Sequence, residues 1–172
     1  MLDFATAHAD VIQATHRGFA FLVVNGLGWL VAGILALRWP VQRTATFLML
    51  MGFVTVPLAL ALRALLGFPP YNPDNPLNTL GLLIAFTPAV AVPAMVIAYV
   101  KYPLYLPSVM AALVGGHFLP YTWLYQTGVY LALGIAVAVV PSALMLAFRD
   151  RGFALGPLFV GAALISGAFV VY

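Results

Sequence analysis

Long apolar segments, separated by short polar loops, fill almost the whole chain. A helix needs about 20 consecutive, mostly apolar residues to span a membrane. Six segments meet or approach this requirement: residues 18–37, 44–66, 77–100, 104–119, 129–148 and 153–172. Their apolar residues are continuous, without the alternation that marks the short strands of a barrel. The pattern therefore predicts an all-α integral membrane bundle of six helices, in a single transmembrane domain over residues 1–172.

Two segments depart from this pattern. Residues 1–16 mix polar side chains with apolar ones, which predicts a short helix at the membrane interface; the apolar members are Leu2, Phe4, Val11 and Ile12. Residues 67–78 contain four prolines and three asparagines, which favour turns over helix. We expect this loop to form a semi-rigid cap between the second and third spans. The fourth span is short, and we expect the chain to leave the helix at Pro120.

Composition excludes other environments and several kinds of site. Apolar residues make up 65% of the 172 residues and charged residues only 6%, whereas a soluble domain is about a quarter charged. The few Lys and Arg residues are scattered, which argues against a nucleic-acid partner. The absence of cysteine excludes disulfides and thiolate-based metal sites. Residues 1–16 carry Asp3 and Asp10 but no Lys or Arg, so they do not resemble a signal peptide.

The positions of the basic residues predict how the bundle is oriented. The loops after the first, third and fifth spans all fall on one side, and they carry Arg38, Arg43, Lys101, Arg149 and Arg151. On the opposite side the basic residues are offset by acids; these residues are Arg17, Arg63, Asp3, Asp10 and Asp74. We therefore expect a multi-pass protein of the cell's inner (plasma) membrane, with both termini outside and membrane lipid as its partner.

The second and fifth spans share a spacing that indicates an internal repeat. Gly52 precedes a Val-Pro step at Pro57, and Gly134 precedes the same step at Pro141. Duplicated halves of three helices each would have opposite orientations in the membrane, as in many transporters. The bundle either consists of two inverted three-helix halves or owes this similarity to chance, because Gly and Pro are common in membrane helices.

Polar side chains within the spans are the candidate functional residues, because they are costly in lipid. His117 stands out, since it follows two glycines that allow close helix approach and its imidazole changes charge near neutral pH. It either meets a ligand or bonds to a neighbouring helix or a tyrosine hydroxyl. A third alternative is a metal site shared with His8 and His16. That alternative lacks further ligands, so we predict no metal site and name no cofactor.

We expect a pocket around His117 that opens to the outside. Its other candidate ligand-binding residues are Asn25, Asn75, Asn78, Tyr121, Trp123 and Tyr125. The aromatic members also fit an interfacial belt. Arg63 is a further candidate, either in a cavity or reaching the lipid headgroups. No Ser–His–acid set, carboxylate pair or phosphate loop is present, so we predict no catalytic residue and favour a protein other than an enzyme.

The stretch GGHFLPYTWLYQTGVY resembles a family of small, uncharacterised multi-pass bacterial membrane proteins. The shared pattern, Gly-x-His-Phe-x-Pro-Tyr-x-Trp-Leu-Tyr-x-Thr and then an aromatic residue, falls on Gly115, His117, Phe118, Pro120, Tyr121, Trp123, Leu124, Tyr125, Thr127 and Tyr130. The stretch DNPLNTLGL and the pairs Arg17-Gly18 and Gly28-Trp29 match as well. The resemblance covers most of the chain. It implies a six-helix fold with a shared polar region, and it implies no function.

Three functions are compatible with these observations. The leading hypothesis is a membrane protein that binds or transports a small polar solute or a lipid headgroup at the pocket around His117, alone or as a homodimer. The second is a structural or accessory subunit of a membrane complex, with its apolar faces as the interface. The third is a small lipid-modifying membrane enzyme with His117 as general base, a role for which the sequence offers no acid partner.

Overall fold

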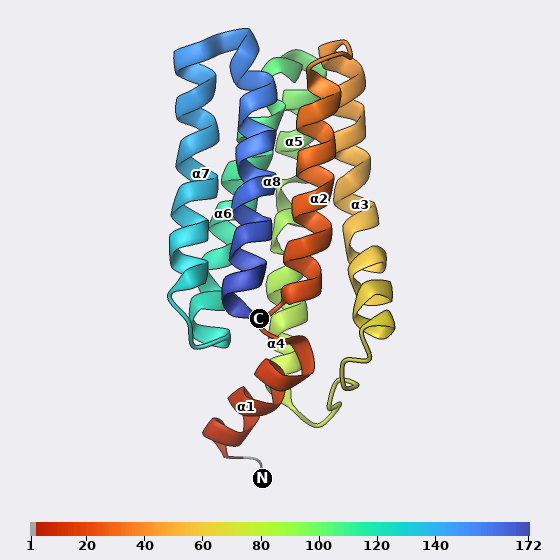
Figure 1. Cartoon of the computed structure of the whole chain (residues 1–172), viewed down its shortest axis with the longest axis vertical. Helices are drawn as coiled ribbons and strands as arrows, with labels where there is room; N and C mark the ends of the chain where they lie inside the picture. The colour runs from red at the N-terminus through yellow and green to blue at the C-terminus, as the bar shows by residue number, and fades with distance from the viewer. Residues whose placement is uncertain (1–2) are drawn as a thin grey trace.

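The structure, a computed structural model, describes residues 3–172, and these form helices and no strand (Figure 1). Leu2, part of the predicted interfacial helix, lies outside the described residues. Six helical rods run up and down the bundle, and a seventh helix, α1 (Phe4–Thr15), lies at its lower end. The rods are α2 (Phe19–Ala36), α3 (Val41–Leu65), α4 (Pro76–Phe86) continued by η1 (Thr87–Ala91) and α5 (Val92–Lys101), α6 (Leu106–Leu124), α7 (Val129–Phe148) and α8 (Gly152–Val171). Short 3₁₀ helices, η2 (Pro103–Tyr105) and η3 (Arg149–Arg151), complete two of the turns.

The predicted all-helical fold of six long helices is confirmed. Four stretches of the described chain are long and apolar enough to cross a membrane: Phe19–Ala36, Val41–Leu65, Pro76–Lys101 and Val129–Val171. The last of them folds back on itself as α7 and α8. The rod α6 is not among them, because its second half carries His117 and a Pro-Tyr-Thr-Trp run.

Two caps begin the helices at the lower end. The carboxylate of Asp3 accepts a hydrogen bond from the backbone N–H of Thr6 at 2.7 Å, which caps α1. The side-chain oxygen of Asn75 accepts from the N–H of Leu77 at 3.0 Å and caps α4, which has Pro76 in its first turn.

Proline affects the rods differently from the sequence-based expectation. The helix α6 does not end at residue 119 but continues through Pro120 to Leu124. A proline removes one backbone donor, and neighbouring groups in a bundle compensate for that loss. In the α4–α5 rod, Pro88 coincides instead with a 3₁₀ break, and the hydroxyl of Thr87 donates at 2.7 Å to the carbonyl of Ile84, which Pro88 leaves without its helical donor.

One side of the bundle is tightly packed through glycine. A Cβ on Gly161 of α8 would lie 2.6 Å from the backbone nitrogen of Leu30 and 2.7 Å from the carbonyl oxygen of Gly26, both on α2. A Cβ on Gly134 of α7 would likewise lie 2.8 Å from the carbonyl oxygen of Gly115 on α6. Small residues at these contacts let the backbones approach closely, as is typical of membrane helices.

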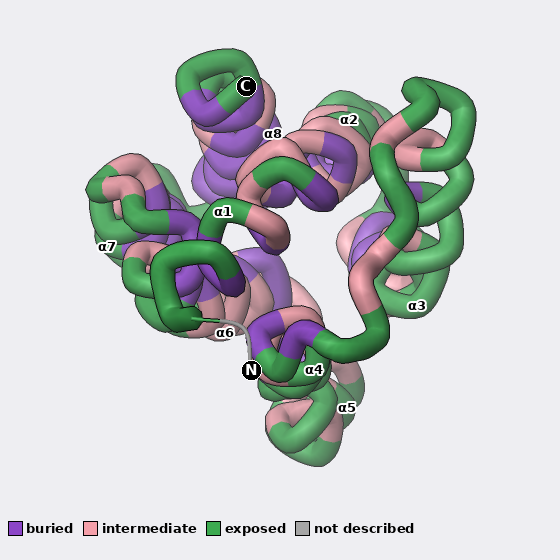
Figure 2. Tube along the Cα trace, turned by 90° about the horizontal axis from the view of Figure 1, so that it is seen from below, coloured by how far each residue is buried: buried purple, intermediate pink, exposed green. Residues whose placement is uncertain are grey.

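The other side is loosely packed. Seen from below, the rods form a ring in the order α2, α8, α7, α6, α4–α5 and α3, with α3 standing apart from α4 and α5 (Figure 2). The helices α7 and α8 pack along their length, whereas α3 makes almost no contact with α4 and η1. The two three-helix halves are therefore packed differently, and the inverted repeat stays a prediction.

The two ends of the bundle differ in charge. The helix α1 and the C-terminal end of α8 lie at the lower end (Figure 1). Five basic residues lie at the opposite end, in or beside the turns between α2 and α3, between α5 and α6, and between α7 and α8; they are Arg38, Arg43, Lys101, Arg149 and Arg151. This segregation is the one on which the predicted orientation depends.

Candidate functional site

A cavity of about 550 Å³ lies inside the loosely packed side of the bundle, among α2, α3, the α4–α5 rod and α6. Its volume is in the range of sites for small molecules. Most of its wall is apolar. Hydrogen-bonding side chains gather mainly toward the lower end; those lining the cavity are Thr15, Asn25, Trp29, Thr55, Tyr71, Asn78, His117, Tyr121, Tyr125 and Tyr130. No charged side chain of residues 3–172 lines it.

Two buried polar atoms on this wall have no hydrogen-bond partner. The Nδ1 atom of His117 makes no hydrogen bond of normal distance and angle, although the ring interacts with the backbone of Val114 on the same helix and lies edge-on to Tyr121 with the ring centroids 5.2 Å apart. The Oδ1 atom of Asn78 is the other, while the same amide donates through Nδ2 to the carbonyl of Asn72 at 2.8 Å. Buried polar atoms in proteins are normally paired. Two residues of the cavity wall therefore each carry a covered hydrogen-bonding atom that no protein group pairs.

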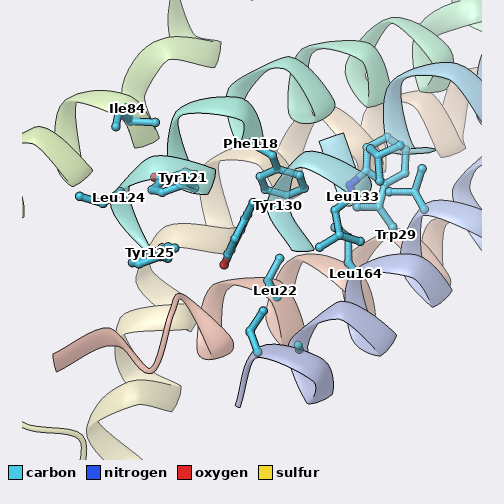
Figure 3. Packing of buried hydrophobic residues seen from close by; sticks show 14 of the residues in the cluster. Leu22, Trp29, Ile84, Phe118, Tyr121, Leu124, Tyr125, Tyr130, Leu133 and Leu164 are labelled. Carbon is cyan, nitrogen blue, oxygen red and sulfur yellow. The ribbon is translucent and has the colours of Figure 1, made fainter. Parts of the chain in front are cut away.

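Three tyrosines form the wall beside these atoms (Figure 3). The rings of Tyr121 and Tyr125 stack with centroids 5.3 Å apart, and Tyr130 packs against both. The hydroxyl of Tyr121 donates to the carbonyl of Gly81 at 3.2 Å, and that of Tyr130 donates to the carbonyl of Arg17. These bonds join α6 to α4 and α7 to the turn before α2.

Arg63 is held at the lower end of α3 and does not line the cavity. Its Nε donates to the carbonyl of Ala14 at 3.1 Å, and its Nη2 donates to the carbonyl of Pro69. Its guanidinium carbon lies 3.9 Å from the centroid of the Tyr71 ring, within the range of a cation–π contact. Burial raises the pKa of Tyr71 above its ordinary value, and the charge of Arg63 opposes this shift. Arg63 thus joins α3 to α1 and to the proline-rich loop.

Asn75 joins α1 to α4 and has no donor left for a ligand. Its side chain is 1% exposed. Its Nδ2 donates to the carbonyl of Ala7 and to the carboxylate of Asp10, both at 2.8 Å. Its Oδ1 caps α4, so every polar atom of this amide is used within the protein.

Trp123 lies outside the cavity, on the α6 surface against α1. Its ring is 46% exposed and contacts Phe4 and His8, with centroid distances of 5.6 Å and 4.7 Å. The Nδ1 atom of His8 lies 3.0 Å from the carbonyl oxygen of Leu124, which fastens α1 to α6.

The structure therefore divides the candidate ligand-binding residues into two groups. Around one cavity it brings together Asn25, Asn78, His117, Tyr121 and Tyr125. It places Arg63, Asn75 and Trp123 in contacts between elements. A ligand-binding role of any of these residues stays a prediction.

Two features of the cavity were not predicted from the sequence. Tyr71 lies in the proline-rich loop, whose composition indicated only turns, yet it contributes a hydroxyl-bearing ring to the wall. Four of the six methionines also line the cavity: Met49, Met51, Met95 and Met110. No sequence signal distinguishes them, because a methionine in a membrane helix also fits a lipid-facing or core position.

The three histidines are not brought together. His16 stacks on Phe68 with a centroid distance of 4.0 Å, while His8 packs on Trp123. Within residues 3–172 no three His, Asp or Glu side chains are close enough to share a metal ion. The structure therefore does not assemble the three-histidine alternative within these residues.

The comparisons with known proteins agree with the resemblance carried by the motif of α6. The profile of a family of unknown function, DUF7010, matches residues 4–172. The chain belongs to this family. No curated protein and no solved structure matches it. The family membership therefore covers the whole bundle, and it leaves the function to be argued from the cavity.

Proposed function

We propose that this protein binds an uncharged amphiphile in the cavity of its bundle. The observation that carries the proposal is a pair of unpartnered, covered atoms, Nδ1 of His117 and Oδ1 of Asn78, in two side chains that line one mainly apolar cavity. A ligand hydroxyl can donate to Oδ1 of Asn78, and a hydroxyl or carbonyl can pair with Nδ1 of His117, depending on which ring nitrogen carries the proton. Once each side chain turns its covered atom toward the cavity, this pairing removes the free-energy cost of leaving the atom unpaired. The apolar part of the ligand is then solvated by the rest of the wall.

The absence of charged side chains from the described cavity wall decides against a charged headgroup. An ion moved from water into an apolar site is costly unless an opposite charge is present. Arg63, the nearest candidate for such a charge, already donates to Ala14 and Pro69. A small polar solute is also a poor fit, because most of the wall would remain without a polar partner. A neutral headgroup on an apolar body satisfies both parts of the wall.

The orientation in the membrane follows from the basic turns. We place these turns in the cytoplasm and α1 outside, in the inner (plasma) membrane. The hydrogen-bonding end of the cavity then lies near the outer surface. A transporter of two inverted halves would carry its ligand from this end across the membrane. The unequal packing of the two halves favours binding without transport.

Binding is tested with 1-monomyristoylglycerol as a neutral probe and lysophosphatidylglycerol of the same chain length as its charged counterpart. Titration into the purified protein, followed by Trp29 fluorescence and by native mass spectrometry, is expected to show saturable binding of the neutral probe only. Trp29 lines the cavity and is 4% exposed, so it reports on occupancy. Trp39→Phe and Trp123→Phe leave it as the sole tryptophan.

Two variants locate the binding site. Asn78→Leu removes one unpartnered atom, and since a hydrogen bond contributes about 1 kcal/mol net, we expect affinity to fall about fivefold. Gly116→Ala changes a residue outside the cavity, where a Cβ meets no heavy atom within 4 Å, and is expected to leave affinity unchanged. Equal binding of the charged and neutral probes, or equal loss in both variants, would overturn the proposal.

A further inference from the structure

We infer that the amphiphile enters sideways from the membrane, through a gap between α3 and the α4–η1 segment, and that it is a single-tailed lipid whose tail lies toward the methionines. This inference rests on the proposed function and specifies the route and class of its ligand. The gap, called the lateral portal below, is bordered by Phe53, Val56, Leu82 and Phe86.

The portal residues face both the cavity and the surroundings of the bundle. Phe53 and Val56 of α3 line the cavity, yet they are 69% and 38% exposed. Leu82 and Phe86 of the opposite rod also line it and are 55% and 63% exposed. Large apolar side chains with this exposure lie in hydrocarbon when the bundle is in a membrane. The cavity is therefore continuous with the lipid at this position.

The portal is closed above and below but not in between. At the upper end, the hydroxyls of Thr46 on α3 and Tyr99 on α5 lie 2.9 Å apart. At the lower end, Arg63 packs on Tyr71. Between these ties α3 makes almost no contact with α4 and η1. Figure 2 shows the backbone of α3 set apart from that of the α4–α5 rod.

The aqueous route at the lower end is obstructed by α1. The helix lies beneath the rods and contributes Val11 and Thr15 to the cavity wall. It is tied to three neighbouring elements: His8 bonds to Leu124 of α6, Asn75 of α4 bonds to Ala7, and Arg63 of α3 bonds to Ala14. Opening this end requires several of these bonds to break. Among the described residues, no side-chain hydrogen bond joins α3 to α4 or η1 across the lateral portal, between the Thr46–Tyr99 contact and the Arg63–Tyr71 contact.

The methionines define the tail end. Met49, Met95 and Met110 pack on a small core cluster of Ala45, Ala98 and Leu106 that closes the upper part of the cavity. Met110 precedes Tyr125 by 15 residues, or roughly 22 Å along the helix at 1.5 Å per residue. Methionine side chains are flexible and adapt to apolar partners of varied shape. This length and the adaptable apolar lining suit one acyl chain.

The test uses a matched pair of glycines. Gly52 lines the cavity on the portal side of α3, and Gly116 lies on α6 outside the cavity; a Cβ on either would have no heavy atom within 4 Å. The probe is monoacylglycerol brominated in mid-chain, delivered in phosphatidylcholine vesicles to protein with Trp29 as its sole tryptophan. Stopped-flow quenching of Trp29 gives the association rate. We expect Gly52→Leu to slow association at least about tenfold and Gly116→Leu to leave it within about twofold.

The outcomes separate this inference from the proposed function. If the wild type shows no saturable quenching, the proposed function fails. If it binds the probe but Gly52→Leu associates at the wild-type rate, or Gly116→Leu is slowed equally, lateral entry is overturned and binding stands. Gly52→Ala, with Gly116→Ala as its control, carries the same comparison if the leucine variant does not fold. A diazirine-bearing probe that labels the portal residues supports the route, and labelling confined to α1 and residues 67–75 contradicts it.

Discussion

The unpartnered Nδ1 of His117 offers a direct test of whether this residue serves a ligand or the fold. A buried polar group without a hydrogen-bond partner costs about 1–3 kcal/mol, and the Nδ1 atom is in this condition. Leucine removes the polar atoms and approximately preserves the volume. We therefore expect His117→Leu to raise the free energy of unfolding of the ligand-free protein by about 1 kcal/mol. For a chain of this length that corresponds to a rise in Tm of about 2–4 °C.

The assay is thermal unfolding of the delipidated protein in detergent, with and without 1-monomyristoylglycerol. The wild type is expected to gain stability from the probe, since a ligand that binds only the folded state stabilises it. His117→Leu is expected to start from a higher Tm and to gain less. Thr44→Val is the control, because Thr44 is fully buried, its hydroxyl has no partner, and it does not line the cavity. It should raise Tm and keep the full gain from the probe.

Two results would refute the reasoning about His117. A lower Tm of ligand-free His117→Leu would mean that the imidazole stabilises the fold through its neighbours. An unchanged gain from the probe would mean that the cavity binds its ligand without this residue. Either result would return His117 to the alternative of a histidine that pins helices together.

Three further predictions concern the elements around the cavity. Asn75→Ala removes the cap of α4 and the two hydrogen bonds that the amide donates to α1. We therefore expect the free energy of unfolding to fall by about 2 kcal/mol and amide exchange in α1, measured by mass spectrometry, to become faster. Unchanged exchange would contradict the proposed attachment of α1 to α4 through Asn75. Gly161→Ala is expected to lower Tm, because its Cβ would lie 2.6 Å from the backbone nitrogen of Leu30. Gly116→Ala faces open space and should raise Tm slightly. Equal shifts of Tm in the two variants would refute the close α2–α8 contact. The N–H of Thr6 holds the pKa of Asp3 below its ordinary value of 3.8, so the contribution of this cap is present above pH 3.8 and is lost as pH falls through the lower pKa of the folded protein. Amide exchange in α1 should accordingly rise, relative to Asp3→Asn, only in that acidic range; an equal rise in both proteins would exclude Asp3 as the cause.

The fold was predictable from sequence to the extent that lipid dictates it. Long apolar segments must form helices in lipid, because no water is available to pair their backbone groups. That argument predicts six rods and needs no knowledge of their contacts. It misplaced the end of α6, because a proline at residue 120 removes only one donor and the packed bundle tolerates the loss. The period-free pattern also contains no information on which rods pack closely, so the loose position of α3 was not predictable.

The candidate site was predictable in part for a similar reason. A polar side chain is costly in lipid, and this argument selected His117 and Asn25, which both line the cavity. The same argument did not separate a polar residue that faces a cavity from one that joins two helices. Asn75 caps α4 and Asn78 lies in its first turn, three residues later. Yet Asn75 uses all its side-chain polar atoms within the protein and Asn78 does not. Only their three-dimensional neighbours distinguish them.

The division of the bundle into a tight and a loose side connects its packing with the proposed binding. Glycine contacts hold α2 to α8 and α6 to α7, while the polar wall is bonded through Tyr130 to Arg17 before α2 and through Tyr121 to Gly81 of α4. A binding site needs its polar groups held in fixed positions, because ordering them on binding would reduce affinity. An entrance needs the opposite, helices that separate at little cost. Here the fixed wall belongs to α6 and α7, and the loosely packed entrance belongs to α3 and the broken α4–α5 rod. The two requirements are thus met by different helices of one small bundle.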